Sequence, residues 1–133
     1  MGSTCTRLKL SFGFRVTMKV LIIHRQQEFL QKVKRKFNRW RWHVKTTSSG
    51  LDGLLISRLH PFDLVLCGFD LPVISGTEIL RTLRIHSVNK ATPAFFISSG
   101  TETKAELHSA DKLNICLLNE ELVAKGKQLA RLN

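Results

Sequence analysis

The side chains that most often carry out chemistry are few in this sequence and are spread along the chain. The five histidines are His24, His43, His60, His86 and His108. They stand on separate predicted elements and lack the spacing that is typical of metal ligands. Ser98 is not in the Gly-x-Ser-x-Gly context of a nucleophilic serine, and no credible base accompanies it. The sequence therefore predicts neither a metal centre nor an enzyme.

A basic segment is the strongest chemical feature of the chain. The residues that we predict to form a basic docking patch are Lys32, Lys34, Arg35, Lys36, Arg39, Trp40 and Arg41. Cations bind phosphates by releasing counterions, and exposed aromatic rings can stack on bases, so nucleic acid and anionic lipid are candidate partners. A protein contact and a merely solvated helix face are the alternatives, because no recognised nucleic-acid motif is present. We expect Trp40 to be exposed, and Phe37 and Trp42 to lie in the core.

The charge of the chain is unevenly placed. The 133 residues carry a formal net charge of +11, and residues 1–45 alone hold 12 Lys or Arg against one acid, Glu28. A field concentrated in this way favours association with anionic surfaces. Hydrophobic residues make up 43% of the chain, as is typical of a globular protein, and no apolar run approaches the roughly 20 residues that span a bilayer.

The cysteines bear on the cellular compartment. There are three, Cys5, Cys67 and Cys116, and none stands in a CxxC pair. Their odd number and their spacing favour small packing residues over a disulfide framework or a zinc site. This use of cysteine suits a reducing compartment, and we expect the protein to be cytoplasmic.

Strand and helix patterns alternate from Met18 onward. Apolar runs predict strands over residues 20–23, 42–46, 64–67, 94–97 and 113–118. Helical spacing predicts helices over residues 26–38, 50–59, 76–86 and 102–109, and from about Glu120. In the second of these helices we expect the apolar face to consist of Leu51, Leu54, Leu55 and Leu59. Five β-α units in this order predict an α/β fold with a doubly wound parallel sheet.

One stretch is similar to a known family motif. Residues 61–76, PFDLVLCGFDLPVISG, resemble the third-strand segment of response-regulator receiver domains, and residues 91–98 and 109–111 support the resemblance. It implies a CheY-like, flavodoxin-like fold with a five-stranded parallel sheet of order 2-1-3-4-5, flanked by helices, over residues 18–133. Residues 1–17 are then an N-terminal extension. Their alternating apolar residues favour an added edge strand, and a flexible tail is the alternative.

The same resemblance implies where phosphotransfer residues would stand. The phosphoacceptor aspartate falls on Gly68, the acidic metal-binding pair on His24 and Arg25, the Thr/Ser position on Ser98 and the lysine on Cys116. Glycine can neither attack a phosphoryl donor nor hold a metal, and Mg²⁺ loses its main ligands. We therefore expect a degenerate pseudo-receiver that is not phosphorylated at the usual site and binds no Mg²⁺ or other cofactor.

The replaced acidic pair leads to a hypothesis about charge. His24 and Arg25 are expected to convert a cation-binding corner into a cationic one, in which Arg25 is a permanent internal cation. Asp70 is the acid nearest to this edge in sequence and is the expected partner of Arg25. The alternative is that these are drifted surface residues at a sheet edge.

The function implied by the resemblance is a phosphorylation-independent protein-interaction module in two-component, phosphorelay signal transduction. The expected partner is a sensor kinase, an adaptor or an output protein, and a homodimer is left open. The alternative function is a nucleic-acid-binding protein that uses residues 32–42.

Overall fold

The computed structural model describes residues 17–125 of the chain. Its strands are β1 (Lys19–Ile23), β2 (His43–Thr47), β3 (Leu64–Gly68), β4 (Ala94–Ser98) and β5 (Cys116–Asn119). Its helices are α1 (Gln27–Arg39), α2 (Gly50–Leu59), α3 (Gly76–Ile85), α4 (Lys104–Lys112) and α5 (Glu120–Ala124). All strand pairs are parallel and the order is β2-β1-β3-β4-β5, so the predicted fold class and strand order are confirmed. The predictions for residues 1–16 lie outside the described residues.

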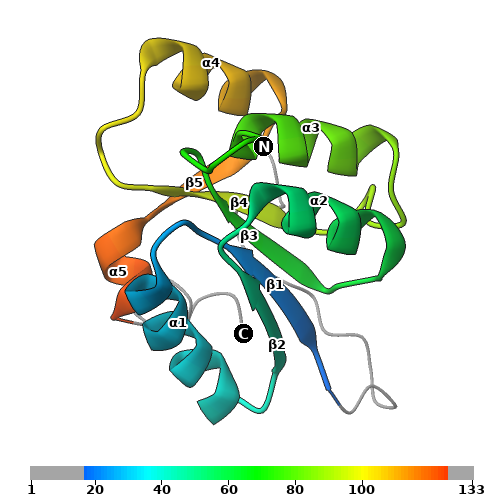
Figure 1. Ribbon diagram of the computed structural model, residues 1–133, viewed down its shortest axis with the longest axis vertical. Coiled ribbons are helices and arrows are strands. Elements are labelled where there is room, and N and C mark those ends of the chain that lie inside the picture. Colours follow the sequence, from blue (N-terminus) through cyan, green and yellow to red (C-terminus); the bar gives the residue numbers. More distant parts are fainter. Residues whose placement is uncertain (1–16, 126–133) are drawn as a thin grey trace.

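The sheet is covered on both faces, which explains why its central strands are apolar throughout. Successive side chains of a strand point to opposite faces, so Val20 and Ile22 of β1 join one core cluster while Leu21 and Ile23 join the other. The first cluster lies beneath α1 and α5, and the second lies beneath the helices on the opposite face, α2 to α4 (Figure 1). A parallel sheet whose faces are both covered requires such continuous apolar strands.

The fifth strand begins later than predicted. The prediction began it at residue 113, but β5 starts at Cys116. Leu113 instead caps the end of α4, and the Ile115 N–H donates to the carbonyl of Ala110 at 3.0 Å. The apolar run at residues 113–118 therefore includes the cap of α4 as well as β5. Periodicity alone does not show where the helix ends and the strand begins.

The buried face of α2 differs from the prediction. Its buried residues are Gly50, Gly53 and Ser57, whereas Leu51 and Leu55 are 49% and 47% exposed. The small residues let α2 approach the sheet closely, because a Cβ on Gly53 would lie 2.6 Å from Cδ1 of Ile23. Leu54 is half-buried and packs against the second core cluster, so the predicted apolar face holds for Leu54. It is wrong for Leu51, Leu55 and Leu59, which are exposed.

The first turn of α3 also approaches the sheet closely. A Cβ built on Gly76 would lie 1.8 Å from the carbonyl oxygen of Gly68, the last residue of β3. The Gly76 N–H donates to the Phe69 carbonyl at 2.9 Å, which closes the turn after β3. Ser75 caps the helix by accepting from the Glu78 N–H. Gly68 can therefore occupy this position only because residue 76 has no side chain.

We expect Gly76→Ala to lower the free energy of unfolding by about 3 kcal/mol or more, because the added methyl overlaps a backbone oxygen that cannot move without displacing β3. Urea unfolding followed by circular dichroism measures the change. Gln31→Ala is the control, because Gln31 is exposed on α1 and should change stability by less than about 0.5 kcal/mol. Equal unfolding midpoints for the two variants would contradict this account of the turn.

Candidate functional site

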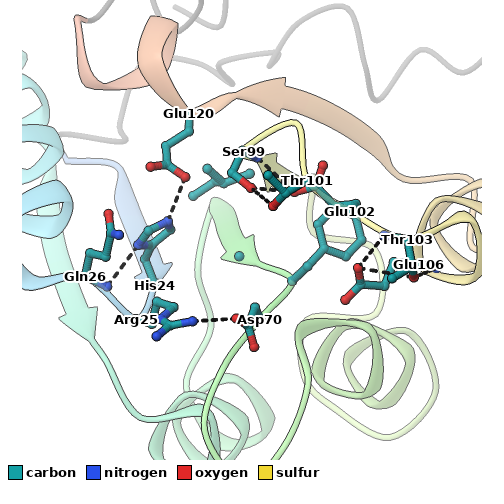
Figure 2. Close-up of a pocket in the computed structure, with 13 residues that line it drawn as sticks. His24, Arg25, Gln26, Asp70, Ser99, Thr101, Glu102, Thr103, Glu106 and Glu120 are labelled. Atoms are coloured by element: carbon teal, nitrogen blue, oxygen red, sulfur yellow. Dashed lines mark hydrogen bonds and ion pairs between the residues drawn. The ribbon is translucent and has the colours of Figure 1, made fainter.

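A pocket lies at the carboxyl ends of the strands, where open parallel sheets place their ligand sites. Its volume is about 460 Å³. Figure 2 shows that residues from the end of β1, the loops after β3 and β4 and the start of α5 surround it. It is lined by His24, Arg25, Gln26, Gly68, Phe69, Asp70, Ile97, Ser99, Thr101, Glu102, Thr103, Glu106 and Glu120. The structure therefore brings together the predicted positions at 24, 25 and 68.

Gly68 ends β3 at the floor of this pocket and is buried. A Cβ on Gly68 would lie 3.2 Å from Cδ2 of His24 and 3.7 Å from the carbonyl oxygen of Ile23. The imidazole of His24 thus crowds the direction in which a side chain at position 68 would leave the backbone. Gly68 itself offers no nucleophile, so it can form no covalent bond to phosphorus through a side chain.

His24 is a buried member of the site, with 5% of its surface exposed. Its ring stacks on Phe29 of α1 at a centroid distance of 4.1 Å. Nδ1 accepts a hydrogen bond from the Gln26 N–H at 3.1 Å, and Nε2 lies 3.4 Å from Oε1 of Glu120 (Figure 2). Because Nδ1 is an acceptor, the proton of the neutral ring belongs on Nε2, where it faces the carboxylate. His24 therefore connects β1, α1 and α5.

The pKa of His24 is lower than the ordinary value of 6.5. Burial is the largest cause, because it disfavours the charged imidazolium, and nearby Arg25 acts in the same direction. Glu120 opposes both by attracting positive charge and by hydrogen bonding. Charging the ring would also place a proton on Nδ1, against the N–H of Gln26. The neutral ring is therefore the form that this environment favours.

Arg25 pairs with Asp70 across the mouth of the pocket, as Figure 2 shows. Nη1 of Arg25 lies 2.5 Å from Oδ2 of Asp70, but the two side chains are 57% and 77% exposed. The hypothesis of a permanent internal cation is therefore wrong, because water reaches the guanidinium. An exposed pair of this kind contributes about 0–1 kcal/mol to stability. Its role is to hold two loop ends near each other.

The corner is also not cationic, contrary to the prediction. Carboxylates outnumber the guanidinium of Arg25 in the pocket, and the imidazole of His24 favours its neutral form. The four acidic side chains of the lining are Asp70, Glu102, Glu106 and Glu120. Three of them stand on segments that the motif does not include, which is why the prediction missed them. A negatively lined pocket disfavours the approach of a phosphoryl group.

Ser98 lies at the end of β4, where its hydroxyl donates to Oε1 of Glu102 at 2.6 Å. Oε2 of Glu102 also accepts from the Ser99 N–H at 2.8 Å, so the carboxylate closes the β4–α4 loop on itself (Figure 2). Burial raises the pKa of Glu102, but the hydrogen bonds from Ser98 and Ser99 outweigh it, and the pKa lies below the ordinary value. The hydroxyl at the remnant Thr/Ser position is therefore already engaged.

Each acid of the pocket has a donor of its own. Asp70 accepts from Arg25, Glu120 faces His24, and Glu106 accepts from the Thr103 N–H in a capping box at the start of α4. Within residues 17–125, no group of three or more His, Cys, Asp or Glu side chains is arranged to hold a metal ion. The Arg25–Asp70 pair was expected from the sequence, and the Thr-x-x-Glu pattern at 103–106 is a further signal that predicts part of this network.

Cys116 does not lie at this site. It pairs with Phe95 at the beginning of β5, whereas Asn119 at the other end pairs with Ser98. The assignment of Cys116 to the lysine position is therefore corrected to Asn119, whose side chain caps α5 by accepting from the Leu122 N–H. Cys67 is a buried free thiol in the second core cluster, as expected of a packing cysteine.

The basic docking patch lies on the outer side of α1 and the turn after it. Lys32, Arg35, Arg39 and Arg41 are exposed, while Lys34, Lys36 and Trp40 are half-buried. The Trp40 ring meets Phe37 edge-on at 5.4 Å, so the prediction that Trp40 is exposed is wrong, while Phe37 and Trp42 are core residues as predicted. No acid within the described part of the chain forms an ion pair with these cations.

The comparisons with known proteins agree with this architecture. The family model of the response regulator receiver domain matches residues 20–115. The cell cycle transcriptional regulator CtrA of Caulobacter vibrioides is 32% identical over 85 residues, which cover 64% of this chain and 36% of that protein. The cell cycle response regulator CtrA of Brucella ovis is 29% identical over 119 residues, covering 86% of this chain and 50% of that protein. The chain thus spans about half or less of these curated relatives.

A solved structure shares the fold. The chemotaxis response regulator CheY4 of Vibrio cholerae superposes with a TM-score of 0.72 at 21% identity, covering 86% of this chain and 98% of that one. Among residues 17–125, no helix has the length and apolar character needed to cross a membrane.

We expect the stability of the protein to fall as the pH decreases from about 7.5 to about 5.5, because the unfolded chain binds a proton at His24 near pH 6.5 while the folded chain resists it. The loss begins as the pH passes below the unfolded value and ends below the lower folded value. Urea unfolding midpoints at the two pH values measure it. His24→Gln, which does not titrate, should reduce the slope, and His108→Gln, an exposed control, should retain it. An unchanged slope in His24→Gln would refute this assignment.

Proposed function

This chain belongs to the response regulator receiver domain family, and we propose that it is a pseudo-receiver that acts as a protein-interaction module without being phosphorylated at the usual site. Gly68 at the end of β3 is the observation that carries the proposal. The acceptor position has no side chain, so a receiver that depends on an acyl phosphate there cannot operate. We propose further that the protein is not an enzyme and works in the cytoplasm.

The surroundings of Gly68 support the proposal. A phosphoryl group brings negative charge, which receivers are expected to balance with Mg²⁺ and a lysine. Here the positions of the metal pair hold His24 and Arg25, and Asn119 stands where the lysine is expected. The remaining carboxylates of the pocket already accept hydrogen bonds or face a cation. The pocket therefore offers neither a Mg²⁺ site nor a lysine to an incoming phosphoryl group. We expect no bound Mg²⁺.

The basic docking patch is the surface that we propose for the partner. It holds six cations on α1 and the turn after it, and no acid within residues 17–125 pairs with them. Charge without an internal partner attracts a negatively charged surface and speeds association. We propose that the partner is a sensor kinase, an adaptor or an output protein with an acidic face. The contact requires no phosphorylation or conformational change at the pocket.

We expect neither the wild-type chain nor Gly68→Asp to acquire a phosphoryl group from a small acyl phosphate in the presence of Mg²⁺. Restoring the carboxylate leaves the metal pair and the lysine missing, and the new Cβ lies 3.2 Å from the His24 ring. Intact-protein mass spectrometry before and after treatment with neutral hydroxylamine, which cleaves acyl phosphates, detects the adduct. A hydroxylamine-sensitive adduct on the wild-type chain would sink the proposal, and one on Gly68→Asp would show that the pocket still supports phosphotransfer.

The binding side of the proposal is tested in the same samples. Binding of a sensor-kinase phosphotransfer domain from the same organism, measured by biolayer interferometry, should be unchanged by Mg²⁺ and by the acyl phosphate. Replacing Lys32, Arg35 and Arg39 with Gln should weaken it about tenfold or more. The matched control replaces Lys90, Lys104 and Lys112, which are exposed and lie outside the basic docking patch. Binding that requires the phosphoryl donor would contradict phosphorylation independence.

Nucleic acid is the second candidate partner, and the unpaired cations of α1 are the observation that favours it. The half-buried Trp40 argues against base stacking, because its ring already contacts Phe37. Binding would then rest on phosphate contacts alone, which give affinity with little sequence preference.

We expect labelled single- and double-stranded DNA and RNA to bind weakly at physiological salt in fluorescence anisotropy. If nucleic acid is instead the natural partner, the dissociation constant will be micromolar or tighter and will rise steeply with salt. Neutralising Lys34, Arg35, Lys36, Arg39 and Arg41 must then abolish binding, while the triple control variant at 90, 104 and 112 must retain it. That combination of results would place nucleic acid ahead of a protein partner.

A further inference from the structure

Helix α2 has apolar residues on both of its sides. Its inner side packs through Gly50, Gly53 and Ser57, as described above. Its outer side presents Leu51, Leu55 and Leu59, which are 49%, 47% and 68% exposed. Three leucines on the exposed side of one short helix give that side the composition of a covered surface, although nothing within residues 17–125 covers it.

The apolar surface continues beyond both ends of the helix. Ile74 contacts the start of α2 at Gly50, and the neighbouring Val73 is 94% exposed. At the other end, the Val88 N–H donates to the carbonyl of Arg58, and Val88 is 59% exposed. Several exposed apolar side chains on and beside one helix mark an interaction site more often than a chance exposure.

The backbone at Val73 adds an independent observation. Its φ is +72°, a region that a β-branched residue rarely adopts and that costs of order 1–3 kcal/mol. The strained residue contributes almost no burial within the domain, since its side chain is 94% exposed. This conformation belongs to a three-residue turn in which the Ile74 N–H donates to the Pro72 carbonyl at 2.8 Å, and the turn holds the Val73 side chain out toward solvent beside the start of α2.

We infer that the α2 face, which consists of Leu51, Asp52, Leu55, Arg58 and Leu59, is the contact surface of a symmetric homodimer in which two α2 helices lie antiparallel. A twofold dimer requires a surface that is complementary to itself. Asp52 is in the first turn of α2 and Arg58 is in the last, so an antiparallel partner places each charge beside its opposite. The leucines meet between them. The antiparallel helix dipoles add to the attraction.

The distribution of charge favours a second copy over a different partner. The α2 face carries one acid and one base and is neutral, whereas the chain carries +11. The basic helix α1 covers the opposite face of the sheet from α2 (Figure 1). A dimer through α2 therefore keeps the two basic surfaces far apart, with both sheets between them. At such a separation, salt screens most of the repulsion between them.

A stable dimer needs a larger surface than α2 alone supplies. A stable interface buries about 800 Å² on each partner, which is more than one side of a helix about 15 Å long supplies. The flanking residues Val73, Ile85 and Val88 extend the apolar area past both ends of α2. The inference does not rest on the proposed function, since it concerns neither the pocket nor the basic docking patch.

Sedimentation velocity of the full chain across a concentration series is the test. We expect a reversible dimer, with a dissociation constant that Leu55→Glu raises about tenfold or more. Leu117→Glu is the matched control, because Leu117 is 40% exposed on β5 and should leave the dimer intact. Circular dichroism melting checks that each variant is folded. A chain that remains monomeric at all concentrations, or a dimer lost in Leu117→Glu and kept in Leu55→Glu, overturns the inference.

A charge exchange tests the antiparallel arrangement and avoids changes to the leucines. Asp52→Arg alone places two arginines together in the dimer, and Arg58→Asp alone places two aspartates together, so each variant should associate more weakly than wild type. An equimolar mixture restores both opposite-charge pairs, and native mass spectrometry should then show mixed dimers in excess of either homodimer. A mixture that associates no better than its components excludes the antiparallel α2 contact.

Discussion

The end of β3 is held by the close approach of the first turn of α3 to Gly68. The first turn of α3 comes so near to the Gly68 carbonyl that position 76 must lack a side chain. This contact determines where the chain turns after β3, and through it the position of Asp70 at the mouth of the pocket. The receiver fold is thus retained around Gly68, a residue without a side chain.

The polar groups around Gly68 are paired with one another. His24 is buried between Phe29 and Glu120, Ser98 donates to Glu102, and Arg25 pairs with Asp70. Within residues 17–125, these polar side chains at the carboxyl edge of the sheet therefore have internal partners. A ligand that bound there would have to displace partners that already satisfy one another.

Site residues that stand directly after a short apolar strand were predicted from the sequence, and those farther from such a strand were not. Gly68, His24 and Arg25 were placed from the sequence because short apolar strands precede them and fix the count. Asn119 could not be placed, since the loop and helix between Ser98 and β5 vary in length and periodicity does not show where α4 ends. The buried side of α2 was assigned wrongly because hydrophobicity favours leucine, whereas the distance between α2 and Ile23 favours glycine. Glu120 depends on a tertiary contact with His24 that no local pattern contains, and Glu102 accepts from Ser98 and Ser99 in a loop that the family motif does not cover.

The two helices that follow β1 and β2 lie on opposite faces of the sheet, and this has a consequence for assembly. A molecule held at α1 and another held at α2 do not compete for space, so either can arrive first and neither must leave. The sheet lies between the two helices and keeps the two bound molecules apart. A domain of 15.1 kDa with two such independent sides is suited to bridge two macromolecules in one ternary complex, as an adaptor does. If one side joins two copies, the resulting particle is divalent, and its avidity for a clustered target exceeds the affinity of a single site.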